Sequence, residues 1–506
     1  MGQIRKQAIF SSIVTYIGFL IGFVNTYFYI KNGTFTPEQY GLTRLITDIG
    51  ATLASFATLG VLSYVYRFFP YYKAHLKDKQ NDQLAWSLLI CTIGFVIVAI
   101  ASMAFEPLII RKFTARSPLL VDYFYWILPY SLGLLMFSLF ESFAWYNHKS
   151  VTSNLLRETG IRIFQLILIA LFLFQWIQFD HFVKLFSLSF IVVAIILVIS
   201  LRKTGKLSLH FKPSKVSKRL SGRIVPYMAL IYGSQLITTI AQYIDSIFIA
   251  GLSPKGLADA GVYTLATFIS NTIQVPQRSI IAATIPVLAA SWRIKNYNEI
   301  QRIYSRSSIN LLLLSLMIFF IIWLNIDDFF DLLNINEDYE AGKTVILILG
   351  ISKIIDAGTG VNSQLIATSR LWKFDVLTSI VLLFFTIPLN YFLVKNIGIN
   401  GSALANLISF TVYNTLRLYF IHKKFSMQPF TVKTLYSILT ALGIYVVCHY
   451  LFADMHGWMG MFLRSSLFSL LMIAAIFGFK LTPDAYQLAV LTKEKVAPFL
   501  RNRNQS

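Results

Sequence analysis

The segment 201–223, LRKTGKLSLHFKPSKVSKRLSGR, is the longest strongly basic run in a largely apolar chain and separates two halves with similar patterns. One constant shift, without gaps, aligns polar, aromatic, small and basic positions of the two halves: Asn25 with Asp245, Phe28 with Phe248, Gly41 with Gly261, and Lys203 with Lys423. This register predicts an internal duplication. The basic segment would join the two copies.

The composition indicates a protein embedded in lipid. Of the 506 residues, 56% are hydrophobic and 13% are charged, which is far more apolar than a soluble domain. The formal net charge of +21 raises nucleic-acid binding as an alternative, but most Lys and Arg lie between apolar segments, where membrane orientation explains them. The two cysteines lie inside apolar segments, and we expect no disulfide framework, metal site or cofactor.

The apolar segments are long enough to cross a hydrocarbon core of about 30 Å. They lie near residues 8–30, 40–67, 84–105, 122–146, 152–176, 179–201, 224–251, 257–290, 303–325, 341–369, 371–395, 398–422, 430–453 and 457–480. The segments lack the short alternation of a β-barrel, and helices satisfy the backbone in lipid. The fold class predicted is an all-α polytopic membrane protein with about fourteen transmembrane helices.

The repeat and the loop charges predict the domain plan and the topology. We expect two parallel six-helix repeats and a C-terminal hairpin, with boundaries at 1–205 for the first lobe, 206–223 for the connector, 224–425 for the second lobe and 426–506 for the hairpin and tail. Basic residues fall on alternate connections, which places both termini in the cytoplasm. Parallel repeats of this kind hold a substrate site between them and alternate its access.

Four of the expected spans carry a polar stripe at three- and four-residue steps, as a helix lining a wet cavity would. The stripes include Asn25 in the first span, Arg44 and Asp48 in the second, Gln235, Gln242 and Asp245 in the seventh, and Asn271, Gln274 and Arg278 in the eighth. The small and hydroxyl residues of these stripes are equally compatible with close helix packing.

Ionised groups at mid-membrane cost at least about 2.5–3.5 kcal/mol and usually face a partner or water. Three pairs stand at helical spacing and can neutralise themselves: Arg44 with Asp48, Glu158 with Arg162, and Lys353 with Asp356. Arg278 has no acidic neighbour at such spacing. We predict Arg278 as a ligand contact, with snorkelling toward headgroups as the alternative. Glu141 is either a proton carrier or a hydrogen-bonded structural carboxyl.

Several short stretches resemble a known family. They are 35–42 (FTPEQYGL), 243–248 (YIDSIF), 260–263 (AGVY) and above all 388–405 (PLNYFLVKNIGINGSALA). These stretches are similar to the polysaccharide (O-antigen, Wzx-type) flippases of the multidrug/oligosaccharidyl-lipid/polysaccharide (MOP) exporter superfamily.

The resemblance implies two six-helix lobes around an alternating-access cavity lined by helices 1, 2, 7 and 8. It implies a multi-pass protein of the bacterial inner membrane that moves undecaprenyl-diphosphate-linked glycan between leaflets. Lipid II flippases of this superfamily use arginines in helices 1, 2 and 8. Arg44 and Arg278 match the second and eighth helices, but the first span has no Arg, which favours a glycan other than lipid II.

The predicted function is therefore an ion-coupled flippase, acting as a monomer on a polyprenyl-linked glycan among membrane lipids, with H⁺ or Na⁺ as the coupling ion. The predicted roles are phosphate binding by Arg44 and Arg278, cavity contacts by Asn25, Gln235, Gln242, Asn271 and Gln274, and ion coupling by Asp48, Asp245 or Asp356.

Three alternatives stay open at this point. A drug/cation antiporter of the same superfamily has about twelve spans and an acidic cavity, so the extra hairpin and the interior arginines count against it. A membrane enzyme that polymerises or ligates lipid-linked glycan would need sizeable outer loops, whereas the outer links here are short. In a purely structural membrane protein, the buried charges would lower the stability and serve no function.

Overall fold

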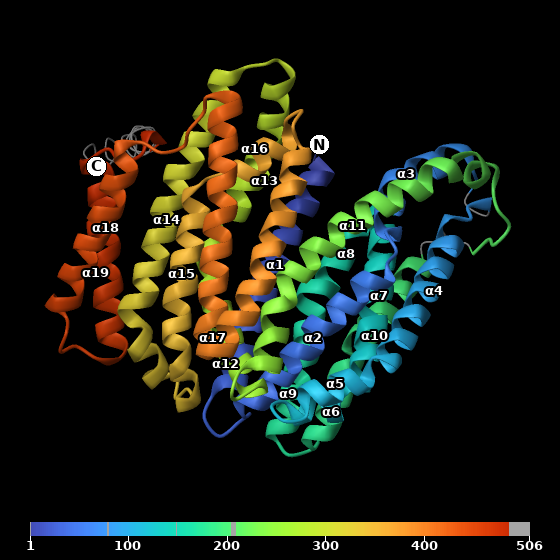
Figure 1. The fold of residues 1–506 in the computed structure, drawn as a ribbon, viewed down its shortest axis with the longest axis horizontal. Helices are drawn as coiled ribbons and strands as arrows, with labels where there is room; N and C mark the ends of the chain where they lie inside the picture. The colour runs from blue at the N-terminus through green and yellow to red at the C-terminus, as the bar shows by residue number, and fades with distance from the viewer. Residues whose placement is uncertain (1, 78–79, 148, 204–208, 485–506) are drawn as a thin grey trace, which may run out of the picture. The chain divides into compact units, whose positions relative to one another are not determined.

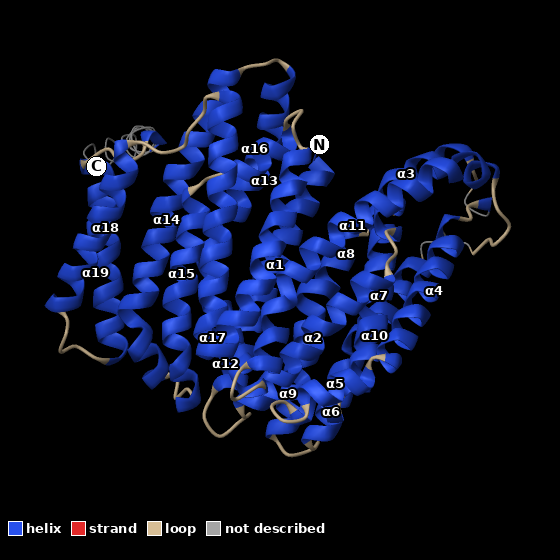
Figure 2. Cartoon of the chain, viewed as in Figure 1, coloured by secondary structure: helices blue, strands red, loops and turns tan. Residues whose placement is uncertain are grey.

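The computed structural model describes residues 2–77, 80–147, 149–203 and 209–484, and Figure 2 shows this part as helices joined by loops. Contact clustering divides the chain into two compact units. Unit 1 comprises Met1–Thr264 with Ile397–Ile399, and unit 2 comprises Leu265–Asn396 with Asn400–Ser506. Each unit is described by itself below.

Unit 1 contains the α-helices that are labelled α1 to α12 in Figure 1, and two short helices, η2 and η3, that carry no label there. They are α1 (Gly2–Ile30), α2 (Pro37–Ala57), α3 (Val61–His75), α4 (Gln83–Ala104), α5 (Glu106–Phe113), α6 (Pro118–Asp122), η2 (Phe124–Trp126), α7 (Ile127–Tyr146), α8 (Ser150–Asn154), η3 (Leu155–Gly160), α9 (Ile161–Leu173), α10 (Phe179–Arg202), α11 (Lys215–Leu252) and most of α12 (Leu257–Asn271).

Unit 2 contains η4 (Thr272–Gln274), α13 (Val275–Arg293), α14 (Tyr297–Leu332), η5 (Glu337–Ala341), α15 (Gly342–Gly358), α16 (Asn362–Thr368), α17 (Lys373–Phe425), α18 (Val432–Leu451) and α19 (Gly457–Gly478). Within α17 the backbone breaks at Gly398, whose φ of 59° lies in the left-handed region that favours glycine. This break separates the two spans expected at 371–395 and 398–422.

The all-α, multi-span fold class is confirmed. Within the described residues, eight helices are long and apolar enough to cross a membrane, or up to ten if two bent helix pairs each count as one span. All of the expected segments are largely helical. The count is lower than the predicted fourteen because α17 holds two expected spans in one element. The π-helical turn η3 interrupts the span expected at 152–176, and the 3-10 turn η4 interrupts the span expected at 257–290. In the span expected at 8–30, only Ile17–Ile30 is counted as an apolar helix, and it is too short to pass as a full span.

The basic connector expected at 206–223 becomes helical before its predicted end. Residues 206–208 lie outside the described residues, 209–214 are non-helical, and α11 begins at Lys215 after an N-cap at Ser214. In unit 1, α11 packs along α2 and α3. The lobe boundaries 1–205, 224–425 and 426–506 therefore remain a prediction from the repeat, whereas the compact units divide after Thr264.

Two glycines that the repeat aligns lie against each other in unit 1. A Cβ atom on Gly41 would collide with the carbonyl of Leu257, and one on Gly261 would collide with the carbonyl of Pro37. Each glycine thus packs against the helix that carries the other, so the starts of α2 and α12 approach at backbone distance. This reciprocal contact is the pattern that two equivalent segments make when they face each other across a two-fold axis.

The C-terminal hairpin expected from residue 426 onward is present as α18 and α19, and it packs on α14 within unit 2. Apolar side chains fill the contact, among them Phe320 and Phe468. A buried carboxylate, Asp328 on α14, pairs with Arg464 on α19 and accepts a hydrogen bond of 2.9 Å from the amide of Gly457. An ion pair and an apolar face together hold this hairpin in place.

Candidate functional site

Unit 1 contains a polar cavity of about 640 Å³. Its walls come from α2, α3, α7, α8 with η3, and α11, and the polar side chains among them are Ser55, Thr58, Ser63, Ser138, Glu141, Asn154, Arg157, Gln235, Thr239 and Gln242. Its size is that of a small-molecule binding site. Such a concentration of hydroxyl, amide and charged groups on membrane-type helices makes it the candidate functional site of this unit.

Two of the predicted stripes meet in this cavity. On α2, Ser55 and Thr58 share one face, and on α11 the residues Gln235, Thr239 and Gln242 recur at steps of four and three. The hydroxyls of Ser55 and Thr239 lie 3.2 Å apart and hydrogen-bond. Gln235 and Gln242 therefore line this cavity, and Gln242 is exposed. Their contact with a substrate stays a prediction.

One ion pair that the sequence analysis did not identify lines the same cavity. Arg157 of η3 pairs with Glu141 of α7 through its Nη1 atom. Glu141 is buried, at 3% exposure, and its Oε1 atom has no hydrogen-bond partner among the described residues. The Arg157 side chain remains 43% exposed. The guanidinium is held by one carboxylate and still open to a second anion.

The local backbone explains how Arg157 reaches this position. Residues Leu155–Gly160 form a π-helical turn between α8 and α9, and such turns often occur at functional sites because they re-aim side chains. Arg157 lies near the start of the span expected at 152–176. Its partner Glu141 lies on another helix, so no helical spacing links the two residues. The sequence offered one signal: two successive expected spans carry charges of opposite sign.

The predicted pair of Arg44 and Asp48 is present on α2, with 2.9 Å between Nε and Oδ2. Asp48 is fully buried, whereas the Arg44 side chain is 35% exposed. Neither residue is among those that line the polar cavity. The pair neutralises itself within one helix, and part of the guanidinium remains accessible.

The side chains of Asn25 and Asp245 are buried in unit 1, and both make hydrogen bonds. The Asn25 side-chain amide donates to the carbonyl of Arg162 at 2.9 Å, so it links α1 to α9. Arg162 also forms the predicted pair with Glu158, at 3.3 Å. The Tyr263 hydroxyl donates to the Asp245 carboxylate at 3.1 Å. Asn25 thus makes a packing contact between α1 and α9, and its predicted contact with a ligand stays a prediction.

In unit 2, the carboxylate of Asp356 is surrounded by amides. It accepts hydrogen bonds from Gln274 at 2.8 Å, Asn414 at 3.0 Å and Gln277 at 3.4 Å. Three neutral donors stabilise the ionised carboxylate without cancelling its charge. The ammonium of Lys353, the neighbour predicted from helical spacing, lies 5.9 Å from the centre of the Phe410 ring.

The other two predicted residues of the eighth span, Asn271 and Arg278, are exposed in unit 2. Arg278 makes no ion pair with another described residue. Whether Arg278 contacts a ligand or headgroups stays a prediction. Arg44 and Arg278 belong to different compact units.

Unit 2 also holds a buried arginine that the sequence analysis missed. Arg417 on α17 is 2% exposed, pairs with Asp375, donates to the Thr378 hydroxyl at 3.0 Å and lies 3.8 Å from the centre of the Tyr413 ring. Asp375 and Arg417 come from opposite halves of α17, on either side of its break at Gly398. The guanidinium is buried and binds protein groups through Nε and Nη2, which indicates a structural role.

Comparison with known families decides the classification. The family model of polysaccharide biosynthesis proteins matches residues 4–292, more than half of the chain. The protein belongs to this family. A second family model, MatE, matches residues 231–392. No curated protein matches the chain in sequence.

Solved structures show the same fold at low sequence identity. A structure titled lipid II flippase MurJ, inward closed conformation, superposes with a TM-score of 0.71 at 15% identity, covering 94% of this chain and 99% of that one. An inward-facing multidrug resistance MATE family transporter of the MOP superfamily gives 0.61 at 15% identity, with 83% and 98% covered. A MOP superfamily transporter from Pyrococcus furiosus, described as having a binding pocket of reverse polarity, gives 0.54 at 13% identity, with 83% and 96% covered.

The chain therefore belongs to the polysaccharide biosynthesis family, matches the MatE model over residues 231–392, and shares the fold of a lipid II flippase and of MOP-superfamily transporters. The prediction of a transporter rather than an enzyme agrees with these matches, because the structures that share the fold are titled as a flippase and as transporters. As a member of the polysaccharide biosynthesis family, the protein is a multi-pass membrane protein. The choice of substrate depends on the residues of this chain.

Proposed function

We propose that the protein is a flippase that moves a polyprenyl-diphosphate-linked oligosaccharide across the bacterial inner membrane, for the biosynthesis of a surface polysaccharide such as the O-antigen of lipopolysaccharide. The observation that supports this most directly is the polar cavity of unit 1, which combines amides and hydroxyls with a half-exposed arginine. Polar and charged side chains inside a membrane-spanning helix bundle destabilise it unless they bind a partner. A polar substrate would be such a partner.

The chemistry of the cavity suits both parts of this substrate. The amides of Gln235 and Gln242 can donate to and accept from sugar hydroxyls. The planar guanidinium of Arg157 can bind a phosphate through two parallel hydrogen bonds. Glu141 would hold Arg157 in place when no substrate is bound. The Oε1 atom of Glu141, which has no partner among the described residues, would accept a hydrogen bond from the substrate or take up a proton.

We retain the sequence-based roles as part of the proposal. Arg44 and Arg278 would bind phosphate, Arg44 by sharing its guanidinium between Asp48 and the ligand. Asn25, Asn271 and Gln274 would contact sugar. Asn25 and Gln274 would first have to exchange the hydrogen bonds that they make within the protein.

For coupling to H⁺ or Na⁺, Asp356 is the strongest of the three proposed carboxylates. Neutral amides hold it, so its negative charge remains for a cation. Asp48 is already paired with Arg44, and Asp245 accepts a hydrogen bond from Tyr263. Transport by alternating access of two parallel repeats, in a monomer with both termini in the cytoplasm, completes the proposal.

A second candidate function is drug/cation antiport, which the MatE match over residues 231–392 favours. A cationic drug would need a net acidic site. The cavity of unit 1 instead balances Glu141 with Arg157, so it offers no excess negative charge. We therefore rank the flippase first.

The test is translocation by purified protein in liposomes. We expect a fluorescent polyprenyl-diphosphate oligosaccharide placed in one leaflet to reach the other faster than in protein-free liposomes, and an imposed H⁺ or Na⁺ gradient to change the rate. Asp356→Asn should remove the response to the gradient. If the glycolipid stays in its leaflet while a cationic dye is exported from the same vesicles, the protein is an antiporter and the proposal is wrong.

A further inference from the structure

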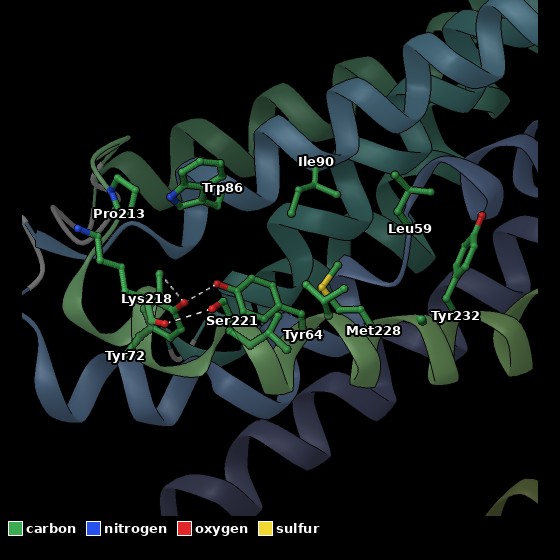
Figure 3. Close-up of a pocket in the computed structure, with 14 residues that line it drawn as sticks. Leu59, Tyr64, Tyr72, Trp86, Ile90, Pro213, Lys218, Ser221, Met228 and Tyr232 are labelled. Atoms are coloured by element: carbon green, nitrogen blue, oxygen red, sulfur yellow. Dashed lines mark hydrogen bonds between the residues drawn. The ribbon is translucent and has the colours of Figure 1, made fainter.

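A second cavity of unit 1, separate from the polar one, opens between α3, α4 and the N-terminal half of α11 (Figure 3). Its volume is about 630 Å³. Most of its wall is apolar, and the aliphatic side chains that line it are Leu59, Ile90, Ile224, Val225, Met228 and Ala229. We call it the α3–α11 groove.

One end of the groove is polar and basic. Figure 3 shows the ammonium of Lys218 and the indole nitrogen of Trp86 at the end near Pro213, whereas Tyr232 and Leu59 mark the opposite end. The indole N–H of Trp86 has no hydrogen-bond partner among the described residues. Because that N–H is buried, the ammonium of Lys218 is the accessible donor. An ammonium at one end of an apolar groove suits an anionic head followed by a hydrocarbon chain.

Three hydroxyl groups of the wall form a chain of hydrogen bonds that ends on Asp82. The Tyr64 hydroxyl donates to that of Tyr72 at 2.8 Å, the Tyr72 hydroxyl lies 2.7 Å from that of Ser217, and Ser217 donates to Asp82 at 2.6 Å. Asp82 also accepts from the amide of Ser214, the N-cap of α11, at 2.8 Å. This chain fixes the start of α11 against α3 and α4, so the groove is preformed.

The charge around the polar end favours an anion. The segment 209–223 contains no acidic residue and five basic ones: Lys212, Lys215, Lys218, Arg219 and Arg223. The nearby Asp82 is fully buried and does not line the groove. Basic clusters beside membrane helices attract anionic lipids by about 1 kcal/mol for each cation near the surface.

We propose that the α3–α11 groove binds an anionic glycerophospholipid of the surrounding membrane. The phosphate lies at Lys218, and one acyl chain follows the apolar wall past the Trp86 ring toward Tyr232. This site is distinct from the cavity assigned to the transported glycolipid, and it does not depend on the proposed function.

The test uses the fluorescence of Trp86 and a quencher in the lipid chain. Full-length protein is reconstituted in nanodiscs with brominated-acyl phosphatidylglycerol or brominated-acyl phosphatidylcholine, and tryptophan quenching is measured against mole fraction. We expect half-maximal quenching of the Trp86 contribution, defined by subtracting Trp86→Phe, at an about five-fold lower mole fraction of the anionic lipid. Lys218→Gln should remove this preference. The matched control Lys215→Gln, an exposed lysine of the same segment outside the groove, should keep it.

Two results would overturn the inference. Equal quenching of Trp86 by both lipids, or a preference that survives Lys218→Gln, would show that the groove does not select an anionic head group. Displacement of the brominated phosphatidylglycerol by an equimolar amount of undecaprenyl phosphate would show that the occupant is an isoprenoid lipid instead.

Discussion

Arg157→Gln is expected to abolish translocation of the lipid-linked glycan while the protein still reaches the membrane. Arg157 is the cation that lines the polar cavity of unit 1, and 43% of its side chain remains open to an anion. A hydrogen bond to a charged group contributes about 1.5–3 kcal/mol, so we expect apparent affinity for the diphosphate to fall by about tenfold to hundredfold. Translocation in liposomes and binding of the glycolipid to detergent-solubilised protein measure the two effects.

This variant also leaves Glu141 buried without its partner, so stability needs its own control. Losing one partner of a fully buried pair costs about 3–5 kcal/mol, and the cost here is smaller because Arg157 is half-exposed. In Glu141→Gln/Arg157→Gln both charges are gone, and the Tm should return toward that of the wild type. Translocation should remain lost. Normal transport by this double variant would exclude Arg157 from phosphate binding.

Arg417→Leu is expected to give the largest loss of stability among single substitutions in unit 2. It removes an ion pair with Asp375, a hydrogen bond to Thr378 and the contact with the Tyr413 ring at one buried position. The expected cost is about 3–5 kcal/mol, because Asp375 keeps its charge in a largely buried place. The Tm in detergent and the yield of folded protein measure the loss.

Two comparison variants separate this mechanism from a general effect of losing an arginine. Arg417→Leu/Asp375→Leu replaces the whole pair by apolar groups and should recover much of the lost Tm. Arg302→Leu removes a cation that is 52% exposed and pairs with Glu299 at 3.5 Å, and should change stability by about 0–1 kcal/mol. A drop in Tm after Arg302→Leu as large as after Arg417→Leu would contradict this account of Arg417.

The fold was largely predictable because its determinants are local and repeat along the chain. Hydrophobic length predicts a membrane helix without knowledge of its neighbours, and the expected segments are largely helical. The repeat register also aligned Gly41 with Gly261, two glycines that pack against each other's helices. What hydropathy did not predict were the interruptions, such as the π-helical turn Leu155–Gly160, because they depend on tertiary contacts.

The ion pairs of unit 1 were predictable only where the two charged residues stand at helical spacing on one helix. Arg44 with Asp48 and Glu158 with Arg162 follow from the four-residue step, and both pairs are observed. Glu141 with Arg157 links different helices across sixteen residues, so no periodicity reports it. Gln235 and Gln242 were found because α11 presents one polar face to the cavity.

The most direct test of the central claim is photo-crosslinking of the glycolipid to the cavity wall. p-Benzoylphenylalanine would replace Gln242, an exposed residue of the polar cavity, or Ile195, an exposed residue of an apolar pocket between α7 and α10. After irradiation with the polyprenyl-diphosphate oligosaccharide in liposomes, lectin detection should show the glycan on the Gln242 variant and not on the Ile195 variant. Equal labelling of both variants, or labelling at Ile195 without labelling at Gln242, would contradict the account.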